Sequence, residues 1–137
     1  MTRHSFIQMS KLSNVKGRIS YVTSPARQEN LYATYNTADA AFWTSLAREN
    51  QQEFKRSGAE GTCIEAREFI IALPEKFTHY DPQRVLTKFT EEFQKRYNVE
   101  CVSGLHHNKA KTNYHIHLIF SERRLLPEPV VKVASRS

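Results

Sequence analysis

The chain has 137 residues, 39% of them hydrophobic and 25% charged, which is the composition of one soluble domain with its own core. No apolar run approaches the roughly 20 residues of a membrane-spanning helix, and the N-terminus lacks the apolar stretch of a signal peptide. We therefore expect a cytoplasmic protein, and the formal net charge of +6 favours a polyanionic partner.

The first half of the chain predicts one strand and two helices. Residues 5–12 form a short apolar strand, and residues 14–23 form a loop that enters a short helix ended by Ser24-Pro25. Residues 26–36 are polar with aromatic interruptions and receive no firm assignment. A longer helix begins at Asp39, a residue type that favours the N-cap, and ends at Ser57-Gly58.

The second half predicts a strand, a helix and a hairpin. The strand covers residues 63–73, and the helix covers 81–98, beginning with an aspartate followed by proline. The hairpin strands cover 99–107 and 114–120, joined by the polar loop 108–113. This order of elements predicts an α+β fold with helices packed on an antiparallel sheet.

The two cysteines and the chain end complete the domain description. Cys63 and Cys101 lie in apolar runs, so we expect two buried free thiols rather than a disulfide. We expect one domain over residues 1–126. Residues 127–137, with two prolines and a basic end, are expected to be a tail leading to a C-terminal region outside this chain.

Four of the six histidines lie within residues 106–117. His115 and His117 are two residues apart on a predicted strand, so both point to one face. If His107 pairs with His115 across the loop, three imidazoles converge from two neighbouring strands. We therefore predict that His107, His115 and His117 bind one divalent metal ion with open coordination positions. His106 points to the opposite face from His107, and becomes a ligand only if a bulge shifts the register.

The histidine motif resembles that of MobA/MobL-type relaxases, which belong to the HUH endonuclease superfamily. The resemblance lies in His107-x7-His115-x-His117 followed by Leu-Ile-x-Ser-Glu-Arg, and in the strand from Glu68 that ends in Ala-Leu-Pro. It implies a ferredoxin-like antiparallel sheet with the helices mainly on one face and the histidines on central strands.

The resemblance also implies a reaction. A tyrosine cuts one DNA strand at a transfer origin, remains bonded to the 5′-phosphate, and the strand is transferred and rejoined. The metal is Mn²⁺ or Mg²⁺, and the partners are single-stranded origin DNA, accessory relaxosome proteins and a coupling protein. The family's nucleophile lies on a short helix after the first strand, which selects Tyr21 over Tyr32 and Tyr35.

Two further groups of residues complete the predicted site. Glu68, an acid within an apolar strand, is expected to orient a ligating histidine or accept the tyrosine proton, or instead to pair with an arginine such as Arg67. Positive charge gathers in residues 1–36 and 104–124. The candidate DNA contacts are Lys11, Lys16, Arg18, Arg27, Tyr32, Tyr35, Lys109, Lys111 and Arg123.

Other functions remain open on the sequence alone. A rolling-circle replication initiator or a single-strand transposase shares the His-hydrophobic-His core. A non-catalytic RNA- or DNA-binding domain shares the expected fold class but stacks bases on sheet aromatics, where this chain is expected to carry histidines. Metal-dependent nicking of single-stranded DNA separates the enzymes from the binding domain.

Overall fold

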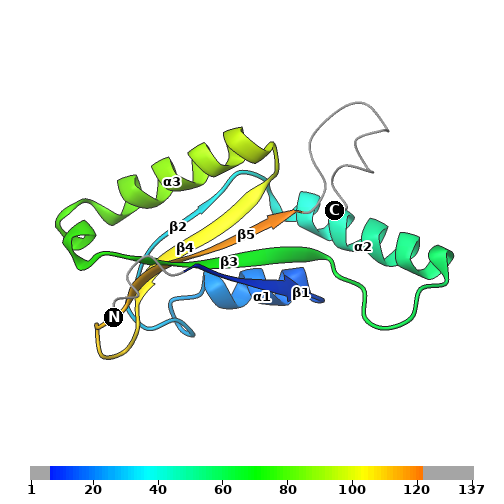
Figure 1. Cartoon of the computed structure of the whole chain (residues 1–137), viewed down its shortest axis with the longest axis horizontal. Helices are drawn as coiled ribbons and strands as arrows, with labels where there is room; N and C mark the ends of the chain where they lie inside the picture. The colour runs from blue at the N-terminus through cyan, green and yellow to red at the C-terminus, as the bar shows by residue number, and fades with distance from the viewer. Residues whose placement is uncertain (1–6, 122–137) are drawn as a thin grey trace.

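The computed structural model describes residues 7–121, and within them five strands form one antiparallel sheet in the order β1-β3-β5-β4-β2 (Figure 1). The strands are β1 Ile7–Leu12, β2 Leu31–Asn36, β3 Ala66–Leu73, β4 Cys101–His107 and β5 Tyr114–Ser121. The helices are α1 Val15–Val22, α2 Ala40–Ser57 and α3 Pro82–Tyr97, with a short 3-10 helix η1 over Glu75–His79. The predicted α+β antiparallel fold is confirmed.

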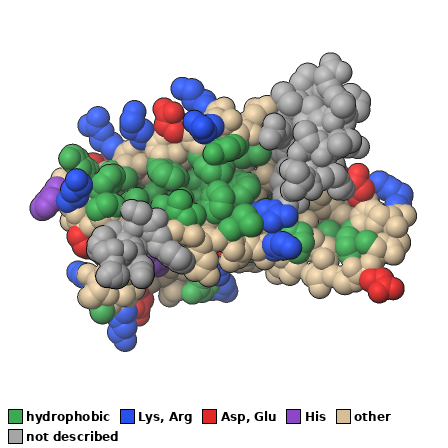
Figure 2. All heavy atoms as spheres, in the orientation of Figure 1, with side chains coloured by type: hydrophobic (Ala, Val, Ile, Leu, Met, Phe, Trp, Pro, Cys, Tyr) green, Lys and Arg blue, Asp and Glu red, His purple; other side chains and the backbone are tan. Residues whose placement is uncertain are grey.

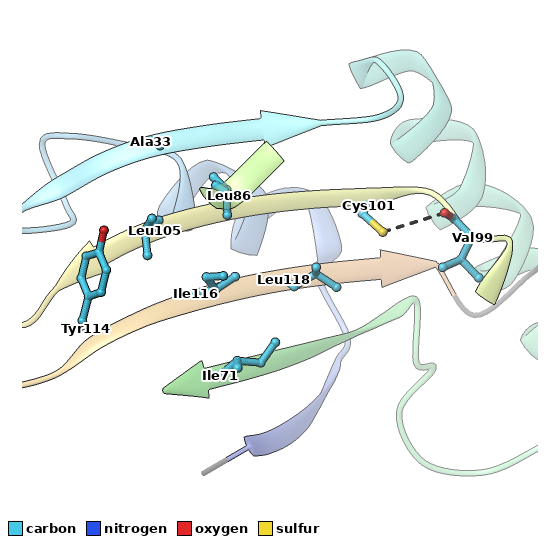
Figure 3. Close-up of a cluster of buried hydrophobic side chains, with 9 residues drawn as sticks. All are labelled: Ala33, Ile71, Leu86, Val99, Cys101, Leu105, Tyr114, Ile116 and Leu118. Atoms are coloured by element: carbon cyan, nitrogen blue, oxygen red, sulfur yellow. Dashed lines mark hydrogen bonds between the residues drawn. The ribbon is translucent and has the colours of Figure 1, made fainter. Parts of the chain in front are cut away.

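Two hydrophobic cores lie on opposite faces of the sheet. On one face, Leu86 of α3 packs on Leu105, Ile116 and Leu118 of the central strands (Figure 3). On the other face, residues of α1 and α2 pack on the strand side chains that alternate with those of the first core. This second cluster contains Leu12, Val15, Val22, Trp43, Leu46, Ala66, Val102 and Ile119. The helices therefore divide between the faces, with α3 and η1 on one and α1 with α2 on the other, so the expectation of helices mainly on one face is wrong.

The helix ends follow the predicted capping residues. The side chain of Asp39 accepts a hydrogen bond from the backbone N–H of Phe42, and that of Asp81 accepts one from the N–H of Arg84, each at 3.0 Å. Asn98 ends α3 in the left-handed conformation, with φ 54°. These contacts fix where the two long helices begin and where α3 ends.

Some element boundaries differ from the sequence expectations. Residues 31–36, which received no assignment, form the edge strand β2, and the strand expected over 63–73 begins at Ala66. Trp43 is the buried aromatic residue of α2. Cys63 and Cys101 are buried and are not joined in a disulfide, as predicted. The expected domain boundary at residue 126 lies outside the described residues.

The edge strand β1 leaves apolar side chains exposed on the sheet face that α3 covers only at the opposite edge, over β2 and β4. Ile7 and Met9 are 57% and 49% exposed, and hydrophobic side chains gather across the face drawn in Figure 2. None of the helices formed by residues 7–121 has the length and apolar character needed to cross a membrane.

Candidate metal centre

Three histidines meet on the sheet face that α1 and α2 cover. His115 and His117 lie on the central strand β5, and His106 lies directly opposite His115 on β4. The ring centroid of His106 is 4.3 Å from that of His115 and 4.8 Å from that of His117. One ligand atom from each histidine lies within 4.8 Å of the others. The three side chains can therefore contact a single ion.

The Nδ1 atom of each histidine ring contacts a protein oxygen. Nδ1 of His106 lies 3.0 Å from the carbonyl oxygen of His107, and Nδ1 of His115 lies 3.2 Å from that of Asn113. Nδ1 of His117 lies 2.6 Å from Oε2 of Glu68. Because these oxygens only accept hydrogen bonds, each ring donates from Nδ1 and leaves Nε2 as a lone-pair donor. Metal-ligating histidines are held in this way in proteins.

The donor set fits a divalent cation. The Nε2 atoms of His106 and His117 are 2.8 Å apart, a hydrogen-bond distance, so the two nitrogens face each other and can share a proton or bind one cation. Burial, together with the neighbouring His106 and His117, lowers the pKa of His115 to about 4, and burial also holds the pKa of His106 below its usual range. Neutral imidazoles are the form that binds metal.

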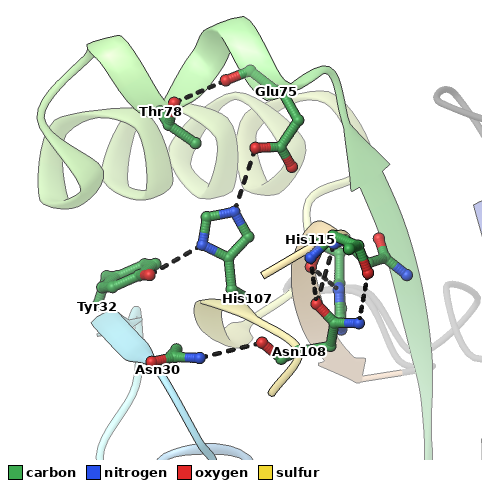
Figure 4. A network of polar contacts seen from close by, with 9 residues as sticks. Asn30, Tyr32, Glu75, Thr78, His107, Asn108 and His115 are labelled. Atoms are coloured by element: carbon green, nitrogen blue, oxygen red, sulfur yellow. Dashed lines mark hydrogen bonds and ion pairs between the residues drawn. The ribbon is translucent and has the colours of Figure 1, made fainter. Parts of the chain in front are cut away.

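The structure places His106, and not the predicted ligand His107, beside His115 and His117. His107 pairs with Tyr114, not with His115, so its side chain points to the α3 face. Both of its ring nitrogens are occupied there: Nδ1 lies 2.8 Å from the hydroxyl of Tyr32, and Nε2 lies 3.4 Å from Oε1 of Glu75. Figure 4 shows His107 held between these two side chains. The expected ligand His107 therefore does not join His115 and His117.

The error is a register shift of one residue, which turns a strand's side chains to the other face. A signal for the correct register was present in the sequence. Leu105 and His107 share a face of β4, and Leu105 packs with Ile116 in the core. Packing Leu105 against Ile116 therefore puts His107 on the α3 face and leaves His106 on the other face, beside His115.

Glu68 joins the metal centre to α1. It is 1% exposed on β3, and besides His117 it binds Arg18, whose Nε lies 2.7 Å from Oε1 and whose Nη2 lies 3.2 Å from Oε2. Burial alone would raise the pKa of Glu68, but the hydrogen bonds from His117 and Arg18 outweigh it and hold the pKa below its usual range. Arg67, the pairing partner considered from the sequence, points to the opposite face.

Tyr21 lies on α1, on the same side of the sheet as the three histidines. It is 38% exposed, and the guanidinium carbon of Arg18 lies 5.0 Å from the centre of its ring. The end of α1 approaches the sheet closely at Gly104, where an added Cβ would lie 3.0 Å from the carbonyl oxygen of Val22. Gly104 pairs with His117, so α1 ends over the strand residue next to a candidate ligand.

Tyr32 and Tyr35 engage the α3 side of the sheet. The hydroxyl of Tyr32 contacts His107, and that of Tyr35 donates to Oε2 of Glu91 on α3 at 2.7 Å. The hydrogen bond to Glu91 is also the main reason why the pKa of Tyr35 is raised. Of the three candidate tyrosines, Tyr21 alone is on the helix that contacts the metal-centre face.

The sequence matches the model of the MobA/MobL family over residues 27–136. The chain belongs to the MobA/MobL family. The resemblance in the histidine motif is thereby confirmed, and membership supports a function of the relaxase type, in mobilisation or conjugation. No curated protein and no solved structure matches the chain. The family match begins after Tyr21, so the assignment of that residue depends on its geometry.

The basic residues expected to contact DNA in this MobA/MobL chain are spread over both sides of the sheet. Lys109 and Lys111 are exposed on the hairpin loop beside His107 and Tyr114. This loop is at the end of the sheet that carries the three clustered histidines, the metal end. Lys16 and Arg27 are exposed on and after α1. Lys11 pairs with Arg67 and shares its α3 face, away from the histidines. Arg123 lies outside the described residues.

Proposed function

We propose that this chain is the catalytic domain of a metal-dependent relaxase, and that Tyr21 nicks single-stranded DNA at a transfer origin. The observation that carries the proposal is the convergence of one ring nitrogen each from His106, His115 and His117, within 4.8 Å of one another, on the sheet face that α1 contacts. A family of relaxases supplies the reaction class. The transfer origin is that of a plasmid or an integrative element.

The three histidines would hold a single Mn²⁺ or Mg²⁺ ion through Nε2. The ion would bind non-bridging oxygens of the scissile phosphate and offset the negative charge that develops as the bond breaks. Because all three ligands are neutral imidazoles, they leave the full charge of the ion for this role. Glu68 fixes the His117 ring by accepting from its Nδ1. Glu68 acts as a positioning residue, since both of its oxygens already accept hydrogen bonds.

The reaction is a transesterification at phosphorus. The phenolic oxygen of Tyr21 attacks, the bond from phosphorus to the 3′-oxygen breaks, the phenolic proton is lost and the leaving 3′-oxygen gains one. The 5′-phosphotyrosine link preserves the ester, so the free 3′-hydroxyl reverses the step and rejoins the strand. Neither direction requires ATP.

Tyr21 is preferred to the other candidates because of the face it shares with the histidines. The hydroxyl of Tyr32 is bonded to His107 and that of Tyr35 to Glu91, both on the α3 side. An attacking hydroxyl must reach a phosphate held at the ligand nitrogens, and the sheet separates Tyr35 from them. Tyr32 is 41% exposed, so part of its ring is open to stack on a base.

The DNA strand is proposed to cross the metal end of the sheet between the hairpin loop and α1. Lys109, Lys111 and Arg27 are exposed on the hairpin loop and after α1 and provide phosphate contacts there, and Lys16, exposed near the start of α1, extends the path toward the other end of the sheet. In the cell, we propose that the domain works in the cytoplasm with accessory relaxosome proteins and a coupling protein that delivers the cut strand.

The deciding experiment uses single-stranded oligonucleotides that tile the DNA flanking the chain's own gene. The protein is incubated with each oligonucleotide and Mn²⁺, and adducts are separated by denaturing electrophoresis. A covalent protein–DNA product that requires the metal supports the relaxase. Binding without any cut strand supports the non-catalytic alternative. A cut at a replication origin or an element end, instead of a transfer origin, supports the replication initiator or the transposase.

A further inference from the structure

Arg18 connects the nucleophile helix to the metal centre through a single buried carboxylate. Its guanidinium binds both oxygens of Glu68, and one of those oxygens also accepts from Nδ1 of His117. The side chain of Arg18 is 30% exposed and that of Glu68 1% exposed. An arginine that holds a carboxylate with two hydrogen bonds fixes direction as well as distance.

The same guanidinium lies over the ring of Tyr21, with 5.0 Å between its central carbon and the ring centroid. Tyr21 follows Arg18 by three residues, so both side chains lie on one side of α1. The next residue, Val22, packs against Gly104, which pairs with His117. Two contacts, one polar with β3 and one steric with β4, therefore seat α1 across β5, the strand between them that carries His117.

We propose that Arg18 is a positioning residue that locks α1 onto the metal centre, so that the placement of Tyr21 and the orientation of His117 depend on one another. The predicted effect on DNA cleavage rests on the proposed function. The predicted effect on metal binding does not, because Glu68 orients His117 whether or not DNA is cut. The proposal assigns Arg18 a different task from a phosphate contact, since two of its nitrogens already bind Glu68.

The metal arm measures Co²⁺ affinity by titration of the protein without DNA. Arg18→Gln is expected to weaken Co²⁺ binding by about 10-fold, because Arg18 holds Glu68, and losing the outer partner of a ligating histidine has effects of that order. Arg48→Gln, which removes the same charge from an exposed position on α2, is the matched control and should bind Co²⁺ as the unaltered chain does. Equal Co²⁺ affinity in the two variants would overturn the coupling.

The catalytic arm separates positioning from phosphate binding. Arg18→Gln is expected to slow adduct formation at saturating DNA by about 100-fold, the effect of a misplaced reacting group, with DNA affinity and its salt dependence nearly unchanged. Arg18→Lys keeps the charge but not the paired hydrogen bonds, and its rate should fall between those of the unaltered chain and Arg18→Gln. If Arg18→Gln instead weakens DNA binding and leaves the saturating rate intact, Arg18 is a phosphate contact and the proposal is wrong.

Folding and the proposed function are controlled separately. Thermal melts establish that each variant is folded. Arg18→Gln leaves the buried Glu68 carboxylate with one partner fewer, whereas Arg18→Lys retains a cation beside it and serves as the folding control. In the Glu68→Gln background, Arg18→Gln should weaken Co²⁺ binding little further, because the two residues act as one unit; full additivity would contradict the link. Should the unaltered chain form no adduct with any DNA, the proposed function fails while the Co²⁺ titrations still decide the coupling.

Discussion

His106 and His115 lie directly opposite each other on β4 and β5, with 4.3 Å between their ring centroids, whereas His107 lies opposite Tyr114. This pairing determines which histidine joins the candidate metal centre. It also places the carbonyl of His107 where it accepts from Nδ1 of His106, so the two neighbours have different tasks.

The first prediction separates the two neighbours. His106→Ala should weaken Mn²⁺ binding by more than about 10-fold, since loss of a ligand exceeds the effect of losing its outer partner. His107→Ala should leave Mn²⁺ binding within a few-fold of the unaltered chain, because its side chain contacts Tyr32 and Glu75 instead. Isothermal titration with Mn²⁺ measures both. Loss of binding in His107→Ala with normal binding in His106→Ala would restore the register expected from the sequence.

The second prediction concerns removal of the metal. A ligand that binds only the folded chain raises its stability by RT ln(1 + [L]/Kd), about 2.7 kcal/mol at a hundred times Kd. Excess Mn²⁺ should therefore raise the melting temperature, and chelation with EDTA should reverse the change. His115→Ala should melt at the same temperature with Mn²⁺ and with EDTA. A Mn²⁺-dependent melting shift that persists in His115→Ala would place the ion elsewhere.

The third prediction tests the hairpin loop as a phosphate-binding element. The logarithm of the binding constant for single-stranded DNA should fall with the logarithm of salt concentration, with a slope of about −0.7 for each phosphate contacted. Replacing Lys109 and Lys111 together by Gln should reduce the magnitude of that slope by about 1.4. Fluorescence anisotropy at several salt concentrations measures it. An unchanged slope would remove the loop from the DNA interface.

The fourth prediction concerns a buried hydroxyl pair on the α3 face. Thr90 of α3 and Ser103 of β4 are fully buried, with their hydroxyl oxygens 2.7 Å apart. Thr90→Val leaves the Ser103 hydroxyl without that partner and should lower the free energy of unfolding by about 1–3 kcal/mol. Adding Ser103→Ala should recover most of the loss. Urea denaturation measures both, and a double variant less stable than Thr90→Val would contradict the pairing. Mn²⁺ affinity should not change, because the metal centre is on the other face.

Local sequence signals predicted most of the fold. Asp39 and Asp81 marked the starts of the two long helices, and both accept the expected N-cap hydrogen bonds. The edge strand over 31–36 was missed because its outward residues are Tyr32, Thr34 and Asn36, and an edge strand buries too little to produce a strong apolar pattern.

The candidate site was predicted only in part because it depends on long-range register. The His-x-His spacing placed His115 and His117 on one face, which the structure bears out. Loop length alone does not distinguish pairing of His107 with His115 from pairing with Tyr114. The contact of Arg18 with Glu68 joins residues 50 positions apart, and no local pattern encodes such a contact.

The most direct test of the account is to locate the DNA on the protein. The adduct formed with Mn²⁺ and a cleaved oligonucleotide is digested with protease and nuclease, and mass spectrometry identifies the peptide that carries the nucleotide. We expect the nucleotide on Tyr21, no adduct in Tyr21→Phe or His106→Ala, and an adduct retained in Tyr32→Phe and Tyr35→Phe. A nucleotide on Tyr32 or Tyr35, or an adduct that forms equally in His106→Ala, would contradict the proposed catalytic face.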